Sequence, residues 1–234
     1  MEYSDVAQVT ESGAARRQAF VTSFGARALT EGFDLDALLA EAAAHAAAGL
    51  GVERAQVLQH RPEADDLLVR AGVGWEPGVV GRAALPAGTA SPPGRALRTG
   101  RAVALQDVRT ADGFEWSGLL RRHGVVSLLD VPVRLPGGAA WGVLEADAGA
   151  PRRFRRDDEH FLLSLAGLLG AAIRRLEMEA ALRDSEALRA PSCRRRSTAS
   201  SPSTRRAASS SGTRRPSAPS ATPAERRSGP TWPS

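Results

Sequence analysis

Residues 119–148 read LLRRHGVVSLLDVPVRLPGGAAWGVLEADA, and this stretch decides the fold. Two runs rich in Val, Leu and Ala, at 125–135 and 139–148, flank Pro136-Gly137-Gly138. This combination predicts two strands joined by a hairpin-type turn. Pro132 predicts a sheet edge or a broken ladder, because proline has no N–H to donate. Gly142 predicts a bulge or a close approach of two backbones.

The chain before this hairpin alternates between helical and extended patterns. A helix is predicted over 34–51, where Asp34 can cap the first turn and Gly51 suits the C-terminal end. Other patterns predict strands at 53–60, 66–73 and 102–108, a short helix at 94–100 and a longer one at 114–124. Strands beside hairpin turns, with helices before, between and after them, indicate an α+β domain built on a central antiparallel sheet.

A long helical pattern covers 157–189, after a shorter helical segment within residues 1–30. Its first half carries apolar residues at 3-4 spacing, which predicts a packing seam for dimerisation and signalling. Residues 177–190 are predicted to be a helical linker, with a merely solvated amphipathic helix as the alternative. The predicted seam consists of Leu162, Leu165, Leu169, Ala172, Ile173 and Leu176.

Charge is divided unevenly along the chain. The net charge is +5, and all 31 basic residues are arginine. Residues 191–234 hold nine of these arginines and one acid, Glu225, so residues 1–190 are mildly acidic and show no basic stripe. This distribution argues against nucleic acid as a partner of the folded part.

The tail, residues 191–234, contains no Val, Ile, Leu, Met, Phe or Tyr. Such a segment cannot bury enough apolar surface to offset its chain entropy, which predicts disorder. Its composition changes at Pro191 to the Arg, Pro, Ser, Ala and Thr that GC-rich DNA yields in a shifted frame. We interpret the tail as a frameshift product. The competing interpretation is a functional basic segment.

Three stretches resemble the GAF domain family, small-molecule-sensing modules of signalling proteins. They are AVALQDVRTADGF (102–114), the hairpin stretch at 119–148, and RRFRRDDEHFLLSLAGLLGAAIRR (152–175). The resemblance covers residues 31–176 and implies a ligand held between the sheet and its connecting helices. By that analogy the candidate pocket residues are Phe114, Trp116, Leu119, Leu120, Ser127 and Trp141, unless these side chains simply fill the core.

Chemistry found in parts of the GAF family requires residues that this domain lacks. Bilin-carrying members and free methionine sulfoxide reductases depend on cysteines, whereas the one cysteine here, Cys193, lies in the tail. The Asn-Lys-Phe-Asp-Glu set of cyclic-nucleotide members is excluded, because the chain has no Asn or Lys. We expect no catalytic residue, no covalent bilin and no metal site. The acids at 157–159 are interpreted as helix-capping, and His123 as the cap of its helix.

Together these expectations give one functional hypothesis. The chain is predicted to be a cytoplasmic small-molecule or redox sensor of the sensor histidine kinase type, without its output domain. It would form a homodimer and signal through its terminal helices, with a ligand and cofactor that the sequence does not identify. No membrane association is expected, since the longest apolar run, 162–173, is too short to cross a bilayer. The alternative is a stand-alone binding or adaptor protein whose basic tail docks on an acidic partner or nucleic acid.

Overall fold

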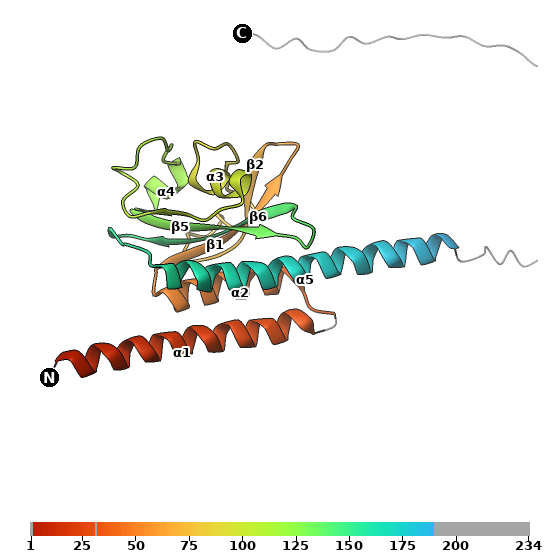
Figure 1. Cartoon of the computed structure of the whole chain (residues 1–234). Coiled ribbons are helices and arrows are strands. Elements are labelled where there is room, and N and C mark those ends of the chain that lie inside the picture. The colour runs from red at the N-terminus through yellow and green to blue at the C-terminus, as the bar shows by residue number, and fades with distance from the viewer. Residues whose placement is uncertain (1, 31, 190–234) are drawn as a thin grey trace, which may run out of the picture. The chain divides into compact units, whose positions relative to one another are not determined.

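A computed structural model describes residues 2–30 and 32–189, and its centre is a six-stranded antiparallel sheet (Figure 1). The strands lie in the order β3-β2-β1-β6-β5-β4. The predicted α+β class with an antiparallel sheet is confirmed, whereas the predicted tail lies outside the described residues. The strand bounds are β1 Arg54–Arg61, β2 Asp66–Val73, β3 Ala84–Pro86, β4 Val103–Leu105, β5 Ser127–Arg134 and β6 Ala140–Ala148.

Helices cover both faces of the sheet (Figure 1). On one side, here called the helix face, α2 and α5 pack on the strands and α1 packs outside them. On the other side, the pocket face, lie α3, α4 and the loops that connect the strands. No helix of the described residues is both long and apolar enough to cross a membrane. The helix bounds are α1 Glu2–Leu29, α2 Leu35–Leu50, α3 Pro92–Thr99, α4 Gly118–Arg122 and α5 Arg156–Arg189.

The helix ends follow capping signals in the sequence. The side chain of Asp34 accepts a hydrogen bond from a backbone N–H of the first turn of α2, and Gly51 ends that helix with a φ of +62°. His123 follows the last residue of α4, and its Nδ1 lies 2.9 Å from the carbonyl oxygen of Leu119. These caps confirm the predicted ends of α2 and the predicted capping role of His123.

The β5–β6 hairpin forms where the sequence predicts it, around Pro136-Gly137-Gly138. Strand β4 pairs only with residues 128–130 of β5, so pairing stops before Pro132 and its missing N–H costs no bond to β4. Gly142 of β6 lies opposite Gln59 of the neighbouring strand β1. A Cβ there would stand 2.0 Å from the carbonyl oxygen of Leu58, which confirms the predicted close backbone approach.

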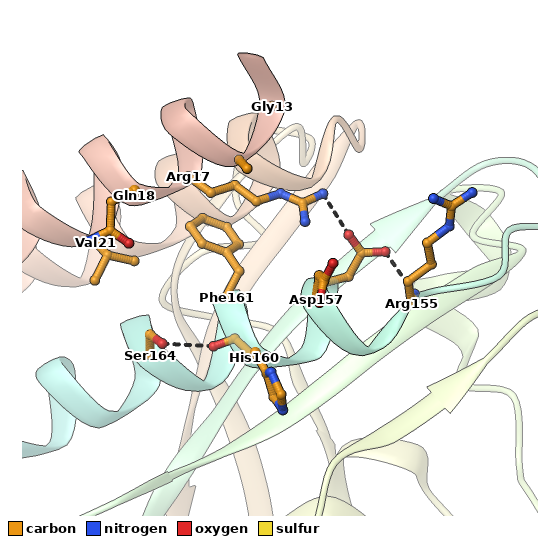
Figure 2. A pocket seen from close by; sticks show the side chains of 11 residues that line it. Gly13, Arg17, Gln18, Val21, Arg155, Asp157, His160, Phe161 and Ser164 are labelled. Atoms are coloured by element: carbon orange, nitrogen blue, oxygen red, sulfur yellow. Dashed lines mark hydrogen bonds and ion pairs between the residues drawn. The ribbon is translucent and has the colours of Figure 1, made fainter. Parts of the chain in front are cut away.

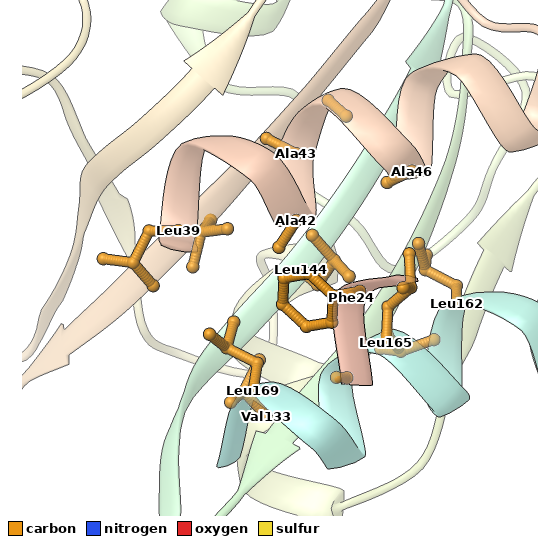
Figure 3. Packing of buried hydrophobic residues seen from close by; sticks show 14 of the residues in the cluster. Phe24, Leu39, Ala42, Ala43, Ala46, Val133, Leu144, Leu162, Leu165 and Leu169 are labelled. Atoms are coloured by element: carbon orange, nitrogen blue, oxygen red, sulfur yellow. The ribbon is translucent and has the colours of Figure 1, made fainter. Parts of the chain in front are cut away.

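The larger hydrophobic cluster lies between the helix face and helices α1, α2 and α5 (Figure 3). Alanines of α2 let that helix approach the sheet closely, and leucines of α5 fill the space beside Phe24 of α1. Five of the six residues predicted as a dimer seam are part of this core and at most 3% exposed: Leu162, Leu165, Leu169, Ala172 and Ile173. Their 3-4 spacing therefore marks packing against the chain's own sheet, and only Leu176 is half-buried.

Two elements are shorter than the sequence predicts. The helix predicted over 114–124 is only α4, because the hydroxyl of Ser117 caps its first turn by accepting from the N–H of Leu120 at 3.2 Å. Phe114 and Trp116 consequently lie in the preceding loop. Of the strand predicted over 102–108, only β4 forms and pairs with β5. The three-residue edge strand β3 was not predicted.

Candidate functional site

The pocket face of the sheet carries the second hydrophobic cluster, which joins β1, β2, β5 and β6 to α3 and α4. Within it lies a cavity of about 10 Å³. That volume holds a single water molecule at most. The residues that line the cavity come from α3, β4, α4, β5 and the segment between β4 and α4: Pro92, Leu105, Val108, Phe114, Glu115, Trp116, Leu120 and Leu128.

Three of the six predicted pocket residues line this cavity, namely Phe114, Trp116 and Leu120. Leu119 belongs to the same cluster but does not line the cavity. The buried hydroxyl of Ser127 donates to the carbonyl oxygen of Ala150 at 2.9 Å, so its role in this structure is to hold the end of β6.

Trp141 lies away from the other predicted pocket residues. The β5–β6 register passes from Val133 opposite Gly142 to Arg134 opposite Ala140, so Trp141 is an extra residue in β6. A bulge of this kind turns a side chain to the other face of a sheet. Trp141 accordingly packs against the cluster on the helix face.

Three fully buried carboxyl groups lie beside this cavity on the pocket face of β5 and β6. Asp130 is directly opposite Glu145 in the sheet, and Asp147 is directly opposite Leu128, which lines the cavity. Asp130, Glu145 and Asp147 are each 0% exposed and are called the carboxyl cluster below. The charge of Glu145 acts on both Asp130 and Asp147.

Few donors serve the carboxyl cluster. Gln56 of β1 donates from Nε2 to Oε1 of Glu145 at 2.6 Å. Among the described residues no N–H or O–H group reaches Oε2 of Glu145 or either oxygen of Asp130 and Asp147, and Oε1 of the buried Gln56 also has no donor. Arg54 lies opposite Asp147 in the β1–β6 pair and offers partial charge compensation from the edge of the cluster.

Electrostatics favour proton binding by the carboxyl cluster. Burial raises the pKa of Asp130 well above its ordinary value, and the charge of Glu145 raises it further. Burial likewise raises the pKa of Asp147, again reinforced by Glu145 and opposed by Arg54. Burial raises the pKa of Glu145 too, although its polar neighbours Asp130, Gln56 and Asp147 counteract part of that shift. The cluster therefore binds protons more readily than exposed carboxyl groups do.

None of the three residues of the carboxyl cluster is among the site residues predicted from the sequence. A signal was present, because Asp130 lies inside the apolar run SLLDVPV, and Glu145 and Asp147 occupy alternate positions of GVLEADA. Charged residues at period two on the inward face of a strand indicate buried polar groups. The cross-strand pairing that brings the two segments together is supplied only by the structure.

A larger groove of about 440 Å³ lies between α1 and the start of α5 (Figure 2). Its central charges are satisfied within the chain. Arg17 donates to Asp158 at 2.6 Å and to the carbonyl oxygen of Gly49 at 2.8 Å, and Asp158 accepts from the N–H of Arg155 at 2.9 Å. The contact from Arg155 confirms the capping interpretation for Asp158, which accepts the N–H of the residue just before α5. The described residues include no group of acids, histidines or cysteines arranged to hold a metal ion.

Known structures share this fold. One is the GAF domain of an Acinetobacter phosphoenolpyruvate-protein phosphotransferase, with a TM-score of 0.59, 19% identity and coverage of 73% of this chain and 98% of that one. Another is the free methionine-R-sulfoxide reductase from Neisseria meningitidis in complex with its substrate, with a TM-score of 0.57, 22% identity and coverage of 70% and 90%. At these identities the likeness concerns the fold alone.

A third similar structure is the phycocyanobilin-bound GAF domain from a cyanobacterial phytochrome, with a TM-score of 0.57, 20% identity and coverage of 70% of this chain and 96% of that one. No curated protein matches the chain. The GAF domain family model matches residues 34–173, which is more than half of the sequence and includes the whole sheet. The chain belongs to the GAF domain family.

Proposed function

We propose that the chain is a sensor module that detects a small molecule or a redox state on the pocket face and reports it through α5, in a signal-transduction protein of the sensor histidine kinase type. The observation that carries this proposal is the position of α5. The first half of α5 is buried against the sheet, and its second half extends past the core with Met178 and Leu182 exposed. One continuous helix thus joins the core to the surface.

The sheet offers a short mechanical path between the two faces. Along β5, Leu128 and Asp130 belong to the pocket face, whereas Leu129 and Val131 pack in the cluster that contains α5. A ligand that moves β5 therefore changes the packing under α5. If two arrangements of this contact exist, a ligand shifts their populations by its difference in affinity for them.

The proposed role is regulatory and not catalytic, and the protein is proposed to act in the cytoplasm. Residues 1–190 contain neither Cys nor Lys, which removes the common thiol and amine nucleophiles. The same absence supports the proposal that no bilin is attached covalently. The serines that cap α3 and α4, Ser91 and Ser117, use their hydroxyls to accept backbone hydrogen bonds.

Ligand retention and hydrogen exchange test this function together. Native mass spectrometry of the purified full chain should reveal a bound small molecule, and its removal should change amide exchange in residues 177–188 of α5. The control is the same comparison with a compound that mass spectrometry shows not to bind, for which exchange in α5 should stay constant. The proposal fails if the exchange of α5 is the same with and without every compound that binds the domain.

A further inference from the structure

The carboxyl cluster is expensive to bury and contributes little to the fold. Three carboxyl groups with no exposure meet only one hydrogen bond from Gln56 and the partial compensation of Arg54. Apolar residues of similar volume at such positions are often neutral or stabilising. The fold itself therefore gives no reason for placing Asp130, Glu145 and Asp147 together.

Five carboxylate oxygens and the amide oxygen of Gln56 point to the chemistry of a missing partner. All six are acceptors without a donor among the described residues, so the partner must supply several N–H or O–H groups. The cluster carries negative charge when it releases its protons, so the partner must be a cation. The described residues are not arranged to coordinate a metal ion, which favours an organic cation with N–H donors.

We propose that the carboxyl cluster, Asp130, Glu145 and Asp147, is the polar floor of a binding site for a small molecule with an ammonium or guanidinium group, which takes the place of protons on these carboxyl groups. This inference rests on the proposed sensing function and gives it a class of ligand. Each N–H of the cation would bond to a carboxylate, and the protons it replaces would leave to solvent.

The cavity beside the cluster is the approach for such a ligand. Leu128, two residues before Asp130 on the same face, forms its floor. Its cover is the loop that carries Phe114 and Trp116. This loop is held at the guanidinium of Arg95, which stacks over the ring of Phe114 at 3.7 Å and donates to the carbonyl oxygen of Gly113 at 2.6 Å. The clamp must open before the cavity, about 10 Å³ in this structure, can admit a small ligand.

Proton exchange makes the proposed binding depend on pH. Two charged side chains lie nearby: Arg54 of β1, which is opposite Asp147, and Glu115, which lines the adjacent cavity. Strand β4 contributes none. The two arginines of α3 bond elsewhere: Arg95 to the loop and Arg98 to Asp65 and the carbonyl oxygen of Ala87. Affinity for the cation should therefore increase with pH, by up to about tenfold per pH unit for each proton displaced.

Methylammonium is the probe, with tetramethylammonium as a control of equal charge that has no N–H. Melting temperatures of the full chain are measured in both chlorides at matched ionic strength, at about pH 5.5 and about pH 8. We expect methylammonium to stabilise the protein more than tetramethylammonium, with a larger difference at the higher pH. Isothermal titration in two buffers of different ionisation enthalpy should show proton release.

Matched variants locate the effect. Glu145→Gln and Asp147→Asn keep the side-chain shape and should abolish the difference between the two cations. Glu63→Gln removes the same charge from an exposed position and should preserve it. The inference is overturned if both cations act alike, or if the difference between them survives in Glu145→Gln. Magnesium chloride is measured alongside, and a stabilisation that magnesium alone produces and that Glu145→Gln abolishes would also overturn it.

The outcome separates this inference from the proposed function. If methylammonium binds through Glu145 and exchange in α5 does not change, the cation site is supported and the sensing role fails. If a retained ligand alters exchange in α5 and methylammonium shows no preference over tetramethylammonium, the sensing role is supported and the cation site is rejected.

Discussion

Gly142 of β6 has no side chain, and its Cα faces the backbone of Leu58 in the paired strand β1. A Cβ at this position would stand 2.0 Å from the carbonyl oxygen of Leu58, so Gly142→Ala must separate two paired strands. Overpacking of this kind typically costs about 1–3 kcal/mol of unfolding free energy. Urea denaturation should show this loss, and Gly88→Ala should leave stability nearly unchanged because its Cβ would meet nothing within 4 Å. Equal stability of the two variants would contradict the close approach.

The carboxyl cluster predicts a stability that decreases as pH increases. Because the pKa of Asp147 is raised in the folded protein, the folded state binds more protons than the unfolded state above about pH 4, and the unfolding free energy falls until the folded pKa is passed. Asp147→Asn keeps a donor toward Glu145 without a titratable group. Its unfolding free energy should therefore exceed that of the wild type at neutral pH and match it more closely near pH 4.

Denaturation of the full chain at a series of pH values checks this expectation. The exposed Glu63→Gln is the matched control, and its curve should run parallel to that of the wild type. A wild-type stability that rises with pH over this range would show that the cluster is ionised without penalty.

At the scale of elements, α5 has two halves with different roles. Leu165 is 0% exposed in the core, whereas Leu182 is 60% exposed beyond it. Leu165→Ala should lower the unfolding free energy by about 2–5 kcal/mol through loss of packing and a cavity. Leu182→Ala should change it by less than about 0.5 kcal/mol. Thermal and urea denaturation compare the pair, and similar losses in both would show that the second half of α5 is also packed in the core.

Most elements could be predicted from local pattern. The alternation around Pro136-Gly137-Gly138 and the caps at Asp34 and Gly51 are short-range signals, and the structure forms the corresponding elements. The length of α4 was mispredicted, because the cap at Ser117 competes with an amphipathic pattern that continues on both sides of it. Helix α5 was predicted with nearly the observed bounds, 157–189 against 156–189.

The candidate site was predicted less well, for reasons of register. Trp141 turns to the helix face because β6 contains one extra residue, and no sequence pattern reveals a bulge at that position. The 3-4 spacing of Leu162 to Ile173 indicates a packing face without identifying the surface that it packs against. The carboxyl cluster arises from pairing Asp130 with Glu145, and such cross-strand contacts depend on the fold of the whole sheet.

At the scale of the whole molecule, we predict a homodimer that uses the exposed half of α5. Met178 and Leu182 lie one turn apart on the same side of the helix and are 58% and 60% exposed. Light scattering of the full chain at roughly micromolar concentration should give the mass of a dimer. Leu182→Asp should shift it toward the monomer, because the interface would then contain an unpaired charge.

Ala180→Asp is the matched control for this prediction. It adds the same charge to the same exposed stretch, on the side of the helix opposite to Leu182. The dimer should persist in this variant. A monomeric wild type, or equal dissociation in both variants, would remove α5 as the interface.

The two edges of the sheet also limit how copies of this protein can meet. Edge strands β3 and β4 each pair over only three residues, and β3 ends at Pro86, which has no N–H to donate. Short edge strands and edge prolines hinder the strand-to-strand addition that drives β-aggregation. Strand-to-strand addition at the described edges is therefore disfavoured, and concentrated solutions should be protected against growth of extended intermolecular sheets.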